Sequence, residues 1–198
     1  YDIKYLGVKY LTVYAFSTEN WKRSREEVDG LMKLFRSYLK KCIKISRDNK
    51  MKIKIIGDIS AFAPDIQESI HKLEEFSKDY DELYFQIAMN YGSRDEITRG
   101  MKKMAQDVAD GKLSPDEVTE SRIESYLDTA GVPDPDLLIR TSGEQRLSNF
   151  LMWQLAYTEF YFTDVAWPDF HKPELIQAIE KYNQRDRRYG GVKEEQHV

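Results

Sequence analysis

Two polar segments of the chain hold the side chains best suited to chemistry. They run Ser17-Thr-Glu-Asn-Trp-Lys-Arg23 and Arg140-Thr-Ser-Gly-Glu-Gln-Arg-Leu-Ser148. In the second segment the two arginines offer forked donors, Ser148 offers a hydroxyl, and the Gly143 backbone offers N–H groups. This set suits a phosphate or diphosphate better than a flat carboxylate. The segment therefore predicts a diphosphate-binding loop, with a solvated turn whose arginines pair with nearby acids as the alternative.

Both segments follow stretches with the pattern of a buried strand. Residues 9–16 are rich in β-branched and aromatic side chains and end at Ser17, and residues 137–139 lead directly into Arg140. Further strands are expected at 52–56, 83–89 and 159–165. Helices are expected from Ser24, where Ser24-Arg-Glu-Glu27 has the form of a capping box, from Pro64, and over 97–108, 150–156 and 173–188.

Strands that alternate with helices in this way are typical of α/β proteins. We expect a single domain over residues 1–198, with right-handed crossovers, a largely parallel central sheet and helices on both faces. Ligands of such sheets bind at the carboxyl ends of the strands. Three polar loops, at 17–23, 90–94 and 140–148, follow strands and are expected to converge there. Neither a Walker phosphate loop nor a G-x-G-x-x-G fingerprint occurs in the sequence.

The composition narrows the class of protein further. Lys and Arg number 30 against 34 Asp and Glu, a net charge of -4, which argues against a nucleic-acid binder that relies on a basic surface. The single cysteine, Cys42, allows no disulfide within the chain and no Cys-based zinc site, and it fits a reducing cytoplasm. No apolar stretch approaches the roughly 20 residues that cross a bilayer. We expect a cytoplasmic protein that is at most peripheral to a membrane.

Several segments, in order along the chain, resemble the motifs of cis-prenyltransferases of the undecaprenyl-diphosphate synthase type. Residues 14–23 match the family's Phe-Ser-x-Glu-Asn-Trp-x-Arg motif, and residues 138–150 match its isoprenyl-diphosphate site. The match continues over Ile55-Ile-Gly-Asp58, residues 153–164, Trp167-Pro-Asp-Phe170 and Arg188-Tyr-Gly190. The resemblance thus covers nearly the whole chain.

This resemblance implies a reaction and a setting. An allylic diphosphate, such as farnesyl diphosphate, would be extended by repeated cis additions of isopentenyl diphosphate, with Mg²⁺ assisting. The product would be a long-chain polyprenyl diphosphate, with undecaprenyl diphosphate for a cell-wall lipid carrier as the expectation. The family also implies a homodimer, in which Arg188 to Gly190 would reach the partner's active site, and peripheral contact with the inner face of the membrane for product release.

The resemblance also implies roles for individual residues. Asn20 matches the family's catalytic asparagine, and Glu159 matches a magnesium ligand. Carboxylates or late residues with supporting roles are Glu27, Glu144, Arg188 and Gly190. The implied substrate contacts are Ser17, Thr18, Glu19, Trp21 and Arg23 for the allylic substrate, and Arg140, Arg146, Leu147 and Ser148 for isopentenyl diphosphate.

The chemistry of four of these residues leaves alternatives open. An asparagine amide is not basic, so Asn20 would orient a water molecule or a phosphate oxygen rather than hold a proton. Trp21 would either stack on the substrate or plug the start of the following helix. A capping role explains Glu27 without catalysis. Glu159 opens a strand, and its position is therefore the wrong end of a parallel sheet for a metal site at the mouth.

Some features depart from the family pattern. The Asp-Gly-Asn-Gly-Arg-Trp loop, which holds magnesium and the allylic diphosphate in the family, does not occur in the sequence, and we expect it upstream of Tyr1. Ser93 and Gln145 stand where the family often has glycine and histidine.

The alternatives to a catalytic prenyltransferase are a non-catalytic partner subunit of a prenyltransferase complex and a phosphate-binding α/β module. Small Ala15 and Ala88 are expected to leave room for a prenyl chain in the core.

Overall fold

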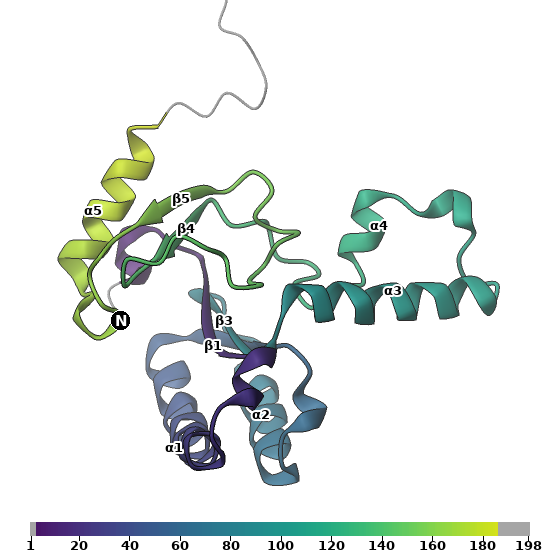
Figure 1. Ribbon diagram of the computed structural model, residues 1–198, viewed down its shortest axis with the longest axis horizontal. Helices are drawn as coiled ribbons and strands as arrows, with labels where there is room; N and C mark the ends of the chain where they lie inside the picture. The colour runs from purple at the N-terminus through teal and green to yellow at the C-terminus, as the bar shows by residue number, and fades with distance from the viewer. Residues whose placement is uncertain (1–2, 186–198) are drawn as a thin grey trace, which may run out of the picture. The chain divides into compact units, whose positions relative to one another are not determined.

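A computed structural model of the protein describes residues 3–185 (Figure 1). The contacts within the chain divide it into two compact units, Tyr1–Val132 and Pro133–Val198, which are described one at a time. Residues 1–2 and 186–198, among them Arg188 and Gly190, lie outside the described residues.

The first unit is built on a three-stranded parallel sheet. Its strands are β1 (Tyr10–Ser17), β2 (Met51–Ile56) and β3 (Leu83–Tyr91), in the order β1-β3-β2. Ile87 of β3 lies between Val13 of β1 and Ile55 of β2 in the register. Both pairs are parallel, and the α/β class with a parallel sheet is therefore confirmed.

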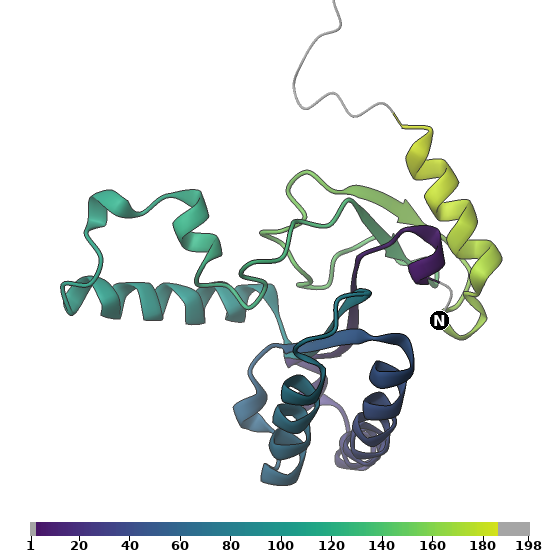
Figure 2. The same ribbon diagram turned by 180° about the vertical axis from the view of Figure 1, so that it is seen from behind.

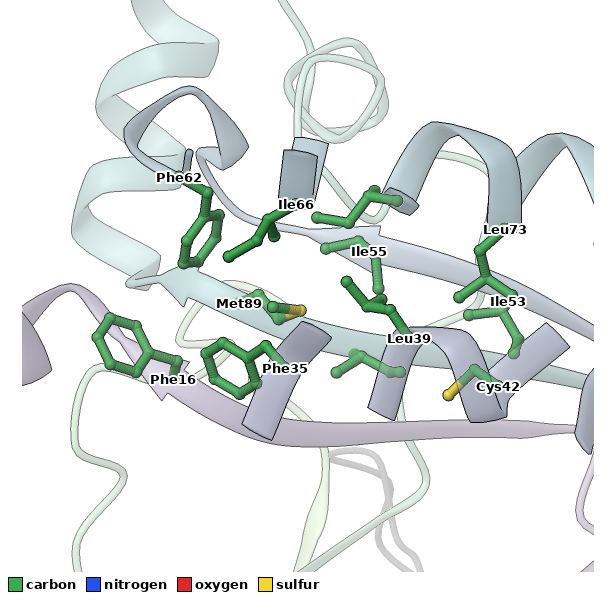
Figure 3. Packing of buried hydrophobic residues seen from close by; sticks show 12 residues of the cluster. Phe16, Phe35, Leu39, Cys42, Ile53, Ile55, Phe62, Ile66, Leu73 and Met89 are labelled. Carbon is green, nitrogen blue, oxygen red and sulfur yellow. The ribbon is translucent and has the colours of Figure 1, made fainter. Parts of the chain in front are cut away.

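Two helices cover this sheet, α1 (Arg25–Asn49) and α2 (Pro64–Ser77). Each begins at its predicted signal: the Ser24 hydroxyl accepts a hydrogen bond from the Glu27 N–H, and α2 has proline in its first turn. The apolar faces of both helices bury against alternate strand residues in one cluster (Figure 3). That cluster contains Phe16, Phe35, Leu39, Cys42, Ile53, Ile55, Phe62, Ile66, Ile70, Leu73, Ile87 and Met89.

The handedness of the connections departs from expectation. The connection from β1 to β2 passes over β3, and the connection from β2 back to β3 runs in the opposite direction across the sheet. Since α1 and α2 share one core cluster on the same face of the sheet, the two crossovers have opposite hands. One of them is therefore left-handed, and the prediction of right-handed crossovers throughout was wrong. Both helices bury their apolar sides against the same face of the sheet, and this shared burial accompanies the exception to the usual preference for right-handed crossovers.

The rest of the first unit extends from β3. The helix α3 (Ser93–Ala109) starts directly after it, and α4 (Glu120–Glu124) follows after a longer connection over residues 110–119 (Figure 1). Short 3-10 helices occupy Ile3–Leu6, Thr18–Lys22, Ile59–Ala61 and Pro115–Glu117, and the second of these, η2, forms all but the first and last residues of the first polar segment.

The second unit contains β4 (Leu137–Arg140), β5 (Glu159–Phe162) and α5 (Lys172–Asn183), with a 3-10 helix at Trp167–Asp169 (Figure 2). The two strands pair in parallel and form a separate sheet, so the five expected strands are divided three and two. The helix predicted at 150–156 is a run of turns instead. Ser148, Asn149 and Leu151 have positive φ angles of 50°, 63° and 44°, which α-helical backbone does not adopt.

Candidate functional site

The first polar loop is closed by Asn20. β1 ends at Ser17, and the Asn20 Oδ1 atom accepts a hydrogen bond of 2.9 Å from the Ser17 backbone N–H. The Asn20 carbonyl accepts a further bond of 3.1 Å from the Arg23 N–H. The amide oxygen of Asn20 is thus engaged in holding the loop. This agrees with an orienting role for this side chain rather than that of a base.

Trp21 joins this loop to the core. Its ring lies edge-on to Phe16, with centroids 5.0 Å apart, and 5.7 Å from the ring of Phe62. Its Nε1–H donates a 2.7 Å hydrogen bond to Asn90 Oδ1. The indole therefore plugs the space above the aromatic core, while 37% of the residue's surface remains accessible. Both interpretations of Trp21 are compatible with this arrangement.

Asn90 and Asp58 complete the support beneath the loop. The sequence placed Asn90 in one of the three polar loops and Asp58 in a matched motif, but it predicted no individual role for either residue. Asn90 is buried and has a φ of 48°. Its Nδ2 donates to the Asp58 carbonyl at 2.7 Å, and the Asp58 N–H donates back to the Asn90 carbonyl at 3.2 Å. Asp58 comes directly after the turn residue that follows β2, and Asn90 is the second-last residue of β3, so their positions at strand ends are the signal that could have found them.

Gly57 permits the close approach of these two strand ends. Its φ is +114°, and a Cβ atom there would lie 2.2 Å from the Met89 carbonyl oxygen. A hydrogen bond from Ser60 lowers the pKa of the adjacent Asp58 carboxyl, and the Arg99 guanidinium adds to the effect. The turn after β2 therefore carries an ionised carboxylate at neutral pH.

The other predicted residues of the first loop lie at its surface. Glu19 and Arg23 are exposed, and Ser17 and Thr18 are half-buried.

Glu27, in the first turn of α1, caps that helix. Its Oε2 atom accepts bonds from the Ser24 N–H at 3.2 Å and from the Ser24 hydroxyl at 3.0 Å. The capping interpretation of Glu27 is therefore confirmed.

The second polar loop follows β4 and is attached through its backbone. The Ser142 N–H donates to the Val165 carbonyl at 2.9 Å, and the Gly143 N–H donates to the Thr163 carbonyl at 3.0 Å. These two N–H groups are thus engaged within the protein, and the prediction that the Gly143 backbone offers donors to a phosphate was wrong. Parallel pairing of β4 with β5 brings the residues after β5 beside this loop.

The arginines of this loop are placed differently from one another. Arg140 is the last residue of β4, and its Nε atom is buried without a hydrogen-bond partner. Arg146 is 68% exposed and forms an ion pair with Glu144, as the solvated-turn alternative predicted. Leu147 accepts a turn hydrogen bond from the Phe150 N–H, and Ser148 lies in the left-handed region. A buried donor without a partner is costly, so Arg140 is the residue here best prepared for an anion.

Glu159 lies where strand order predicts. It is the first residue of β5 and pairs with Leu137, three residues before Arg140. At about 3.3 Å per residue this is roughly 10 Å along the strand from the polar loop. Its Oε2 atom is held by Arg185 Nη1 at 2.5 Å, and Arg185 Nη2 donates to the Phe160 carbonyl at 2.9 Å. Glu159 is therefore engaged in an ion pair.

Glu159 and the other carboxylates of the described residues do not by themselves form a site that fits a magnesium ion. Mg²⁺ prefers several oxygen ligands in octahedral geometry. Among residues 3–185, no group of three or more Asp, Glu, His or Cys side chains could hold a metal ion. Glu159 would contribute one carboxylate only after release from Arg185.

The small residues expected to leave room in the core do not act together. Ala88 is fully buried, but it lies on the face of β3 opposite to Ile87 and Met89, which contact α1 and α2 through the core. Ala15 is exposed beside an irregularity in the β1 register. The structure therefore does not bring Ala15 and Ala88 together on the face that packs against α1 and α2, and room for a prenyl chain beside them stays a prediction.

Each of the two units has a polar loop that follows a parallel strand, and the loop after β4 begins at a buried, unpartnered arginine donor. These features define an α/β protein with polar loops at the ends of its parallel strands. That class includes enzymes acting on phosphorylated substrates. The family model Prenyltransf, of undecaprenyl diphosphate synthases, matches residues 2–190. The chain belongs to this family and is a prenyl-transferring enzyme.

Individual relatives agree with this membership. An isoprenyl transferase of Clostridium perfringens is 50% identical over 188 residues, which cover 95% of this chain and 74% of the relative. One of Fusobacterium nucleatum is 51% identical over 188 residues, covering 95% of this chain and 79% of the relative. The crystal structure of lavandulyl diphosphate synthase from Lavandula x intermedia with dimethylallyl diphosphate superposes with a TM-score of 0.91 at 38% identity, covering 94% and 81% of the two chains.

Proposed function

We propose that the protein condenses isopentenyl diphosphate units onto an allylic diphosphate, such as farnesyl diphosphate, and makes a long-chain polyprenyl diphosphate. Undecaprenyl diphosphate, for a cell-wall lipid carrier, is the proposed product. The observation that supports this most directly is the buried, unpartnered Nε donor of Arg140 in the loop that resembles the family's isoprenyl-diphosphate site. Two units, matched by one continuous family model, would then serve as a single catalytic domain.

The reaction assigns work to both loops. The bond between C1 and oxygen of the allylic diphosphate breaks, a bond forms between C1 and C4 of isopentenyl diphosphate, and a proton leaves C2 of the latter. Arg140 and Arg146, with Leu147 and Ser148 beside them, bind the isopentenyl diphosphate. An anion there would compete with Glu144 for Arg146.

The first loop serves the allylic substrate in this proposal. Ser17, Thr18, Glu19, Trp21 and Arg23 contact it. Asn20 positions the group that accepts the proton, a water molecule or a phosphate oxygen, because its own amide cannot hold a proton near neutral pH. The hydrogen bond from Ser17 to Asn20 fixes that orientation.

Magnesium is part of the proposal through the family alone. It would neutralise charge on the leaving diphosphate. Glu159 is the proposed carboxylate from this chain, with the remaining ligands outside residues 3–185. The binding and orientation steps above depend on the arginines and Asn20 and not on the ion.

Assembly and location complete the proposal. We expect a homodimer that is cytoplasmic, with peripheral contact at the inner face of the membrane as the polyprenyl product is released. None of the helices among residues 3–185 is long and apolar enough to cross a bilayer. A non-catalytic partner subunit is not favoured, because the similar proteins are transferases.

A direct assay tests the function. The full-length protein is supplied with farnesyl diphosphate, radiolabelled isopentenyl diphosphate and Mg²⁺, and lipid products are separated by length. The expected result is label in long polyprenyl chains. Absence of incorporation, with a folded protein, would contradict the proposal.

A further inference from the structure

We propose that Arg99 and Asp128 form a positioning pair for the allylic-substrate loop. The pair holds the turn after β2, and through that turn it sets the position of Trp21. Neither residue lies in a loop that we assign to substrate binding. Their effect on the reaction, which rests on the proposed function, would pass entirely through other residues.

The pair itself is a bidentate ion pair between α3 and the segment after α4. Arg99 Nη1 lies 2.9 Å from Asp128 Oδ1, and Nη2 lies 2.6 Å from Oδ2. The third guanidinium donor, Nε, lies 2.7 Å from Asp95 Oδ2. The side chains of Arg99 and Asp128 are only 24% and 16% exposed. Such a geometry fixes both side chains in direction as well as in distance.

The pair reaches the turn after β2 through one carboxylate oxygen. Asp128 Oδ2 also accepts a 3.0 Å hydrogen bond from the Gly57 N–H. The backbone of Asp128 is held from the other side, since its N–H donates to Glu96 Oε1 at 2.9 Å. Glu96 is fully buried and accepts a 2.6 Å bond from the Tyr91 hydroxyl. Asp128 is therefore fixed relative to the end of β3.

Two further hydrogen bonds connect this turn to the loop. The Asp58 carbonyl, one residue after Gly57, accepts from Asn90 Nδ2 at 2.7 Å, and Asn90 Oδ1 accepts from Trp21 Nε1 at 2.7 Å. Each link in the series uses a buried or half-buried polar group with a defined direction. Displacement of the Asp128 carboxylate would therefore be transmitted to the indole.

A purely structural role is the competing interpretation. The pair would then do no more than attach the α3 and α4 region to the sheet. The structure offers a matched control, because the Tyr126 hydroxyl donates to Asp107 Oδ2 at 2.7 Å and also joins the segment after α4 to α3. This bond is separate from the series that runs from Asp128 through Gly57, so its loss tests attachment alone.

The test compares Asp128→Ala, Asp128→Asn and Tyr126→Phe in the full-length protein. The sequence has three tryptophans, Trp21, Trp153 and Trp167, so the indole N–H signal of Trp21 in a nitrogen-15 correlation spectrum is assigned with Trp21→Phe. We expect Asp128→Ala to shift or broaden this signal and to raise the KM for the allylic diphosphate about tenfold. Asp128→Asn, which keeps an oxygen for the Gly57 N–H, should give a smaller change in both.

The control separates the outcomes. Tyr126→Phe should leave the Trp21 signal and the allylic KM unchanged. An unchanged Trp21 signal in Asp128→Ala, or the same shift in Tyr126→Phe, would overturn the positioning role. The spectrum does not depend on catalysis, so an inactive wild-type protein would count against the proposed function, while the indole shift would still test the positioning pair.

Discussion

The two polar loops differ in how they are held. The loop after β1 is fixed by side chains: Asn20 closes it, and Trp21 is bound to Asn90. The loop after β4 is fixed by its backbone, through the N–H groups of Ser142 and Gly143. Its arginines contribute little to that attachment, since Arg146 pairs with the neighbouring Glu144 and the Arg140 Nε atom has no partner.

This difference separates positioning from binding. Where side chains hold a loop, a substitution that impairs function should also lower the free energy of unfolding. Where the backbone holds a loop, its charged side chains are available to a ligand, and their loss should reduce binding without a comparable loss of stability. Substitutions in the two regions therefore distinguish the two arrangements.

The largest expected loss of stability is that of Gly57→Ala, in the turn after β2 that supports the first loop. The new Cβ would lie 2.2 Å from the Met89 carbonyl at a φ of +114°. We expect a loss of about 3 kcal/mol or more in the free energy of unfolding, measured in urea. Gly30→Ala in α1 is the control, because the new Cβ meets nothing within 4 Å. This substitution should raise the free energy of unfolding by about 0.5–1 kcal/mol. Equal effects of the two substitutions would break the account of the first loop.

A smaller effect is expected for Trp21→Phe. The substitution keeps most of the aromatic contact and leaves the Asn90 amide oxygen without its donor, at a cost of about 1–3 kcal/mol. Trp167→Phe serves as the control, since Trp167 is 64% exposed and its change should stay within about 0.5 kcal/mol. Thermal unfolding of both variants checks this. A Trp21→Phe protein as stable as the control would show that the hydrogen bond does not hold the loop.

The smallest effect concerns Glu27, for which capping and catalysis were both open. Glu27→Ala should lose about 0.5–1 kcal/mol, because the capping box is broken. Glu27→Gln retains the capping geometry and removes the charge. Unchanged steady-state rates in Glu27→Gln would limit this residue to capping, whereas a reduced kcat at unchanged stability would assign its carboxylate a part in the reaction.

Local features of this molecule followed from the sequence, and distant contacts did not. The starts of the strands, the Ser24 capping box and the position of Glu159 depend on neighbouring residues, and all three were predicted, the starts to within about one residue. Two strand ends differ from the prediction by more than one residue, since β3 continues to Tyr91 and β5 already ends at Phe162. The bond between Trp21 and Asn90 joins residues 69 positions apart, and no local pattern indicates it. The same holds for the engagement of the Gly143 N–H by Thr163. The turns at 150–156 depend on non-glycine residues in the left-handed region, which apolar spacing does not reveal.

The most direct test of the contrast between the loops is calorimetric binding of isopentenyl diphosphate alone to Arg140→Ala, alongside its thermal unfolding. Arg47→Ala is the control, with a side chain that is 61% exposed in α1. We predict a reduction in affinity of about 10- to 100-fold for Arg140→Ala, from a lost charged hydrogen bond worth about 1.5–3 kcal/mol, with an unfolding temperature close to that of the control. Unchanged affinity, or a loss of stability that accounts for the change, would contradict the account.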